Sequence, residues 1–238
     1  AIREALKQAK AEDKRPTLII GKCIMGKGAR RADNTSYERC CNTHGAPLGG
    51  DAYKNTIINL GGDLENPFVI FDDVKAIYTK RAEELKEIVA ARKAEEAAWA
   101  EANAEKAAQL EDWFNGVVPA IDWDSIQQKA NDPTRNASAT VLSVLAEKVP
   151  NMIVSSADLS NSDKTDGFLK KTKAFTKGDF SGKFFQAGVS EFTMACIMNG
   201  MALHGGVIPA CGTFFVFSDY MKPVVRLSAL MRLHVIYI

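Results

Sequence analysis

The carboxylate of Glu191 lies in the segment GVSEFTMACIMNGMALHGG, which runs from Gly188 to Gly206. Apolar residues recur along this segment at helical spacing, so the pattern predicts a helix that begins beside Glu191 and packs against a core. An acidic residue in the first turn of a helix interacts favourably with the helix dipole. A carboxylate in apolar surroundings can instead take part in acid–base catalysis. The spacing alone favours the first role and leaves the second open.

Three aromatic residues, Phe214, Phe217 and Tyr220, follow one another at intervals of three. Rings at this spacing can offer a flat apolar surface on which a planar ligand stacks. They can equally be a stripe of core residues on one face of a helix, and the spacing by itself favours the core.

Two basic residues lie in contexts that could contact a ligand. His44 belongs to THGAPLGG, where glycine and proline predict a rigid loop able to approach a ligand closely. Arg135 directly precedes a predicted helix and could hold a phosphate, although a solvated cation or a structural ion pair is the simpler role for it. The stretch GKGARR lacks the complete phosphate-loop pattern, so we expect no nucleotide site there.

The composition excludes several classes of protein. A net charge of +1 over 238 residues gives no electrostatic reason to expect nucleic acid or an anionic membrane as a partner. No apolar run approaches the roughly 20 residues that a membrane-spanning helix needs. The five cysteines form no C-x-x-C pair, and the three histidines do not cluster with acids. We therefore expect free thiols in a reducing cytosol and no metal site made by this chain alone.

Strands and helices are predicted to alternate along the chain, which indicates an α/β fold with a doubly wound parallel sheet. Helices are expected at 1–14, 51–59, 136–148, after Ser190, and at 218–232, and strands at 16–22, 151–156, 206–214 and 234–238. The segment 16–22, PTLIIGK, is apolar throughout, as is typical of a strand buried in a parallel sheet. A polar, lysine-rich loop is expected at 160–182.

A long segment rich in alanine, glutamate and lysine extends from Asp72 to Trp113 and predicts a solvated helical connector without a sustained heptad repeat. The chain opens inside a helix and stops on an apolar strand. We therefore expect both ends to be cuts within a longer protein.

Four segments found in one chain in this order resemble transketolase: THGAPLGGD, SADLSNSDKT, GVSEFTMACIMNGMALHGG and GTFFVFSDYMKPVVRLSALM. The resemblance covers essentially the whole chain and implies a parallel-sheet thiamine diphosphate-binding fold made of two partial domains joined by a long helical connector. Residues 1–70 would be the C-terminal part of the pyrophosphate-binding domain. Residues 71–133 would be the connector, and 134–238 the N-terminal part of the pyrimidine-binding domain.

The resemblance also implies roles at the pyrimidine end of the cofactor. Glu191 would share a proton with N1′ of the aminopyrimidine ring. Phe217 would stack on that ring, while Phe214 and Tyr220 would line its pocket. Ser190 stands where the family commonly has arginine, which puts any contact of that arginine in doubt.

Further residues would contact the rest of the cofactor and the substrate. Asp158 would lie near the thiazolium, and Met25 would lie against the cofactor. His44 would contact the cofactor diphosphate and the substrate oxygens and assist proton transfer. Arg135 and Ser162 would hold the phosphate of the sugar, since an arginine fork and a hydroxyl suit a phosphate dianion.

The activity implied by the resemblance is the transfer of a two-carbon ketol unit from a ketose phosphate to an aldose phosphate through a thiamine diphosphate ylide, in the pentose phosphate pathway. The family's Mg²⁺ or Ca²⁺ ligands would lie upstream of Ala1, and the site would form in a cytoplasmic homodimer. The chain by itself is therefore expected to be inactive. A related enzyme such as a deoxyxylulose phosphate synthase is one alternative, and a non-catalytic fragment or subunit is the other.

Overall fold

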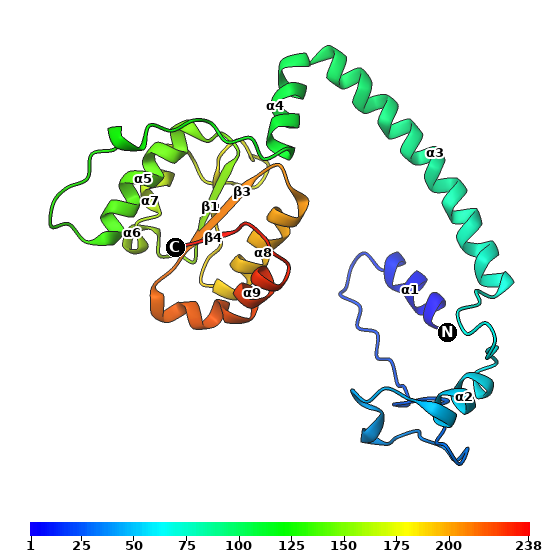
Figure 1. The fold of residues 1–238 in the computed structure, drawn as a ribbon. Helices are drawn as coiled ribbons and strands as arrows, with labels where there is room; N and C mark the ends of the chain where they lie inside the picture. Colours follow the sequence, from blue (N-terminus) through cyan, green and yellow to red (C-terminus); the bar gives the residue numbers. More distant parts are fainter. The chain divides into compact units, whose positions relative to one another are not determined.

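A computed structural model describes all 238 residues, which form two compact units, Ala1–Ala91 and Arg92–Ile238 (Figure 1). No helix in either unit combines the length and the apolar character needed to cross a membrane.

The second unit is built on a four-stranded sheet in which every neighbouring pair of strands is parallel. The strands follow the order β2-β1-β3-β4. Their bounds are Met152–Ser156 for β1, Phe184–Gln186 for β2, Ile208–Gly212 for β3 and Ile236–Tyr237 for β4. The two central strands, β1 and β3, pair along their full length, from Met152 beside Ile208 to Ser156 beside Gly212. The α/β fold with a parallel sheet is therefore confirmed.

Helices cover both faces of this sheet (Figure 1). On one face lie α5, Thr134–Lys148, and the short α7, Asp166–Leu169; on the other lie α8, Glu191–His204, and α9, Ser218–Leu230. Successive residues of a strand point to opposite faces, so Ala210 joins the first core and its neighbour Cys211 joins the second. The expected doubly wound arrangement follows from this alternation.

The segment 160–182, expected to be a loop, contains two short helices: α6, Ser160–Asp163, and α7. Strand β2 was not predicted either. Each of these elements has four residues or fewer, so it carries too little periodic pattern to be recognised. Phe168 of α7 and Phe184 of β2 are fully buried in the first core, which holds these two elements in place.

In the first unit, α2, Gly50–Asn59, supports a folded loop that precedes it. The Arg30 amide donates to Thr56 Oγ1 at 2.9 Å, and Asn59 Nδ2 donates to the Gly28 carbonyl at 2.9 Å. Gly28 has a φ of +80°, and a Cβ there would lie 2.5 Å from Leu60 Cδ2, so this close approach requires glycine.

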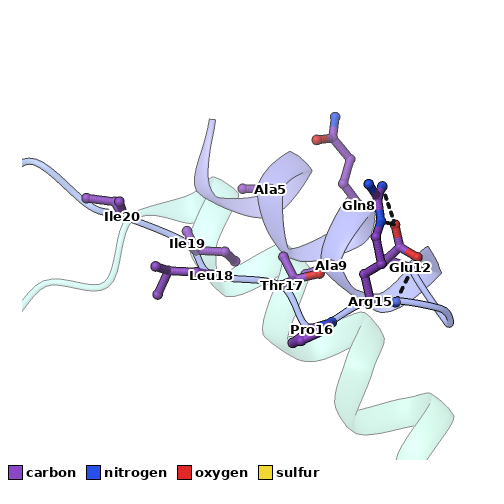
Figure 2. Close-up of a pocket in the computed structure, with 10 residues that line it drawn as sticks. All are labelled: Ala5, Gln8, Ala9, Glu12, Arg15, Pro16, Thr17, Leu18, Ile19 and Ile20. Atoms are coloured by element: carbon purple, nitrogen blue, oxygen red, sulfur yellow. Dashed lines mark hydrogen bonds and ion pairs between the residues drawn. The ribbon is translucent and has the colours of Figure 1, made fainter.

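The predicted strand at 16–22 is wrong for this chain, because the segment is extended but pairs with no other strand. It runs beside α1, Ile2–Ala11, and shares a shallow pocket with it (Figure 2). Leu18 and Ile20 remain 83% and 77% exposed. A parallel strand exists only through its neighbours, and no strand of this chain is a neighbour of this segment.

The predicted connector consists of α3, Asp72–Ala102, and α4, Ala104–Phe114, which are interrupted at Asn103. No residue of α3 is buried. The boundary between the compact units falls within α3. In the second unit, the Phe114 ring lies 5.9 Å from that of His204 and would contact a Cβ placed at Gly206.

Candidate active site

A cavity of about 670 Å³ lies in the second unit at the carboxyl ends of β1 and β3. The residues after β1 and the first turns of α8 and α9 supply its walls: Ala157, Asp158, Leu159, Val189, Ser190, Glu191, Phe192, Thr193, Phe217 and Tyr220. In open parallel sheets, ligands bind at this edge, where loops follow the strand ends. Four of the predicted site residues, Glu191, Phe217, Tyr220 and Asp158, therefore lie on one cavity.

Glu191 is the first residue of α8, and it is 8% exposed. Glu191 lines the cavity, and its carboxylate forms no hydrogen bond within the chain. Ser190 before it has a non-helical backbone, with φ −156° and ψ 58°, and its hydroxyl donates to the Ala187 carbonyl at 2.7 Å. The N-terminus of α8 stabilises a negative charge at this position. The carboxylate oxygens remain open to solvent rather than enclosed in the core, so a ligand in the cavity could reach them and form a hydrogen bond.

The three predicted aromatic residues form a continuous stack. The rings of Phe214 and Phe217 have centroids 6.0 Å apart at 16°, and those of Phe217 and Tyr220 are 6.2 Å apart at 24°. None of the three belongs to either core cluster, and Tyr220 is 61% exposed. The alternative of a core stripe is therefore excluded. Phe217 and Tyr220 line the cavity. Phe214 is not part of the lining, but its ring stacks on that of Phe217.

Asp158 lies in a tight turn directly after β1, with a left-handed φ of +65°. The Ser156 hydroxyl accepts a hydrogen bond from the Leu159 amide at 3.1 Å, and it donates to Asp163 Oδ2 at 2.7 Å. The Thr165 amide and hydroxyl donate to Asp163 Oδ1 at 2.9 and 2.8 Å. Asp163 thus fixes both ends of the segment that carries Asp158.

Asp163 is a residue that the sequence analysis missed. It is 6% exposed, so it is a buried acid whose partners are all hydroxyl or amide donors. Its pairing with Thr165, two positions later, is an Asx-type local bond. The D-x-T spacing could have indicated that bond, but nothing local indicates the bond to Ser156.

Arg135 and Ser162 lie outside the cavity lining. Arg135 is exposed in the first turn of α5 and forms no ion pair within this chain. Ser162 is half-buried in α6, and its hydroxyl lies 3.3 Å from Asn161 Oδ1. No hydrogen bond joins the two residues.

The remaining predicted site residues, Met25 and His44, lie in the first unit on segments that touch each other. The Arg39 amide donates to the Met25 carbonyl at 2.9 Å. Gly26 follows Met25 and Thr43 precedes His44, and a Cβ placed at Gly26 would lie 3.1 Å from Thr43 Oγ1. Both predicted side chains are exposed. No set of three or more histidine, cysteine or acidic side chains in the chain is arranged to hold a metal ion.

Two family descriptions match the chain. "Transketolase, thiamine diphosphate binding domain" matches residues 1–119, and "Transketolase, pyrimidine binding domain" matches residues 132–238. Bacillus subtilis transketolase is 40% identical over 98% of this chain and 35% of its own length. Arabidopsis thaliana "Transketolase-1, chloroplastic" is 37% identical over 100% of this chain and 32% of its own length.

Solved structures agree with these matches. The transketolase from Leishmania mexicana superposes with a TM-score of 0.75 and 30% identity, over 99% of this chain and 34% of that one. A Pichia stipitis transketolase in complex with a sedoheptulose phosphate gives a TM-score of 0.74 and 31% identity, over 99% of this chain and 35% of that one. The chain therefore spans about one third of the length of the proteins that it matches.

Proposed function

The chain belongs to the transketolase family, and from this premise we propose that it is part of an enzyme that transfers a two-carbon ketol unit from a ketose phosphate to an aldose phosphate with thiamine diphosphate as cofactor. The observation that carries the proposal is the unpartnered, buried Glu191 in a cavity that Phe217 and Tyr220 also line. The similar proteins described above are named transketolases, which supports this activity over that of a deoxyxylulose phosphate synthase.

The cavity residues fit the pyrimidine end of the cofactor. An aminopyrimidine is a planar ring with a basic nitrogen at its edge. Phe217 and Tyr220 supply aromatic faces for its plane, and Glu191 supplies an oxygen without a partner for its edge. The diphosphate end needs a divalent cation, and the chain contains no cluster of side chains that would hold one. The proposal therefore places Mg²⁺ or Ca²⁺ on ligands outside these residues.

When bound, the cofactor supplies a carbon nucleophile and a sink for the electrons of the broken carbon–carbon bond. Glu191 holds a proton at the ring nitrogen of the pyrimidine, and its helix N-terminus stabilises the carboxylate when that proton leaves. Phe217 fixes the plane of the ring, and Phe214 and Tyr220 hold Phe217 in place by stacking against it.

The rest of the proposal uses Asp158 of the cavity and four residues outside it. Arg135 and Ser162 hold the sugar phosphate, supported by the free guanidinium of Arg135 and by the amides at the start of α5, which attract anions. Asp158 lies beside the thiazolium. Met25 contacts the cofactor, and His44 moves a proton at the substrate oxygens.

The proposal includes a second copy of the same protein, with the site completed between the copies, and a cytoplasmic location in the pentose phosphate pathway. The alternative is a chloroplast location, because the Arabidopsis relative is named as a chloroplastic protein. The domain boundaries 1–70, 71–133 and 134–238 are likewise part of the proposal.

The test is ketol transfer by the protein that contains this chain, with and without Glu191→Ala. We expect turnover to fall by at least about 100-fold, because general acid–base groups contribute roughly 10²- to 10⁴-fold. The matched control is Glu95→Ala on the exposed surface of α3, which should leave turnover unchanged. Near-normal turnover by the folded Glu191→Ala protein would remove Glu191 from the mechanism. No ketol transfer by the unaltered protein would favour the non-catalytic alternative.

A further inference from the structure

Cys40 and Cys41 are adjacent in the loop that leads to His44, and their thiols converge on one atom. Cys40 Sγ lies 3.4 Å and Cys41 Sγ lies 3.5 Å from Asn42 Oδ1. Cys40 is half-buried and Cys41 is exposed. The other three cysteines, Cys23, Cys196 and Cys211, have no neighbouring thiol in the sequence.

A disulfide between adjacent residues is strained. A trans peptide bond holds consecutive Cα atoms about 3.8 Å apart, whereas ordinary disulfides join Cα atoms roughly 4.4 to 6.8 Å apart. Strain makes such a bond easy to reduce, which is the property of labile disulfides rather than structural ones. A pair of this kind can therefore be oxidised and reduced reversibly.

A disulfide between Cys40 and Cys41 would enclose the peptide bond that joins them, and this peptide bond takes part in a hydrogen-bonded turn. Its oxygen, the Cys40 carbonyl, accepts hydrogen bonds from the Thr43 amide at 3.2 Å and the Thr43 hydroxyl at 2.8 Å. The next carbonyl, of Cys41, accepts from the His44 amide at 2.9 Å. These bonds form the short 3₁₀ turn Cys41–Thr43. Closing the ring must twist this peptide bond, so it must disturb the turn that leads to His44.

We propose that Cys40 and Cys41 form a modification site, a vicinal dithiol that low-molecular-weight disulfides oxidise. The exposed Cys41, as the thiolate, attacks one sulfur of the small disulfide. That S–S bond breaks, a mixed disulfide forms on Cys41, and the first small thiolate leaves and takes up a proton. Cys40 then loses its proton and attacks Cys41 Sγ, which releases the second small thiol. In sum, two cysteine thiols are oxidised and one small disulfide is reduced to two thiols.

This site is independent of the proposed ketol transfer, since it requires neither the cofactor nor the sugar. It can be tested on the folded 238-residue chain with oxidised glutathione as the probe. Trypsin cuts after Arg39 and Lys54 and so releases one peptide, 40–54, that contains both thiols and no other cysteine. After alkylation of free thiols, we expect this peptide to have lost two hydrogens in mass and to carry no alkyl group and no glutathione.

One variant and one reductant separate ring closure from simple thiol exchange. In the Cys40→Ser variant the reaction should stop at the mixed disulfide, with one glutathione retained on Cys41. In the oxidised, unaltered chain, dithiothreitol should restore both free thiols. Amide hydrogen exchange at Thr43 and His44 should speed up on oxidation and slow down again on reduction. Glutathione retained on the unaltered peptide, alkylation of both thiols, or a cross-link between chains would overturn the proposal. Ring closure without a change in amide exchange would overturn its link to the His44 turn.

Discussion

At the scale of single residues, the second unit contains two buried acids in opposite situations. Glu191 has no partner and lines a cavity, whereas Asp163 accepts three hydrogen bonds. A buried acid whose oxygens are bonded stabilises its surroundings, whereas an acid that lines a cavity remains available to a ligand. The difference supports a structural role for Asp163 and a chemical one for Glu191.

Asp163→Ala should destabilise the second unit by about 3 kcal/mol, because it leaves the buried donors of Ser156 and Thr165 without their acceptor. Asp163→Asn keeps an oxygen that can accept from Thr165, so it should lower the free energy of unfolding by less than Asp163→Ala does. Urea denaturation followed by circular dichroism measures both. Asp124→Ala, at an exposed position, is the control and should leave the midpoint unchanged. Equal midpoints for Asp163→Ala and Asp124→Ala would exclude the clamping role.

Burial raises the pKa of the Cys211 thiol to about 12. The folded state therefore keeps this proton at a pH where the unfolded chain releases it, and the associated stability is lost as pH rises from about 9 toward 12. Burial also raises the pKa of Tyr237, so its effect has the same sign. We expect the free energy of unfolding to fall across this range in urea titrations. Cys211→Ala should make the fall shallower, and an identical slope in that variant would contradict the assignment.

At the scale of elements, the cavity depends on how α8 and α9 are held against the sheet. Asn199 of α8 accepts hydrogen bonds from the Ser228 hydroxyl at 2.7 Å and the Tyr237 hydroxyl at 2.9 Å, and it donates to the Val224 carbonyl at 3.2 Å. One buried amide therefore joins α8, α9 and β4. Since Glu191 begins α8 and Tyr220 belongs to α9, this network fixes the helices that carry both cavity residues.

Substituting alanine for a glycine should have opposite effects on stability at Gly212 of β3 and at Gly200 of α8. A Cβ at Gly212, where β3 ends, would lie 2.6 Å from Thr165 Cγ2, so Gly212→Ala should cost about 1–3 kcal/mol through overpacking. Gly200, inside α8, has open space around its Cβ position, so Gly200→Ala should gain about 0.5–1 kcal/mol. Thermal unfolding of the two variants measures the difference. A stabilised Gly212→Ala variant would show that the strand end is less tightly packed than the structure indicates.

At the scale of the whole molecule, the predicted site residues are divided between the two units. The second unit contains the cavity with Glu191, Phe217 and Tyr220, and the first unit contains Met25 and His44. The chain covers about one third of its relatives' length and contains no cluster that would hold a metal ion. Cofactor binding by these residues alone should therefore be incomplete.

We expect the isolated 238-residue chain to bind thiamine diphosphate weakly and without dependence on Mg²⁺, because the diphosphate would lack its cation. Isothermal titration calorimetry with and without Mg²⁺ measures this, and Phe217→Ala serves as the variant that removes an aromatic face. Tight binding that requires the metal would contradict the prediction and would mean that this chain provides the metal ligands.

Features that depend on local pattern could be predicted from the sequence. The helix at Glu191 follows from helical spacing, and the parallel sheet follows from alternating strands and helices. Four ordered segments indicated the family. The residue roles at the site remain predictions, although the cavity brings Glu191, Asp158, Phe217 and Tyr220 together.

Only the tertiary structure decided the features that depend on distant partners. It gave Asp163 its bond to Ser156 and Asn199 its bonds to Ser228 and Tyr237, and it formed β2 beside β1. It also left 16–22 unpaired, although its composition is that of a buried strand. The physical reason is common to these cases: a helix closes its hydrogen bonds within its own segment, whereas a strand or a buried polar side chain needs partners that no local pattern specifies.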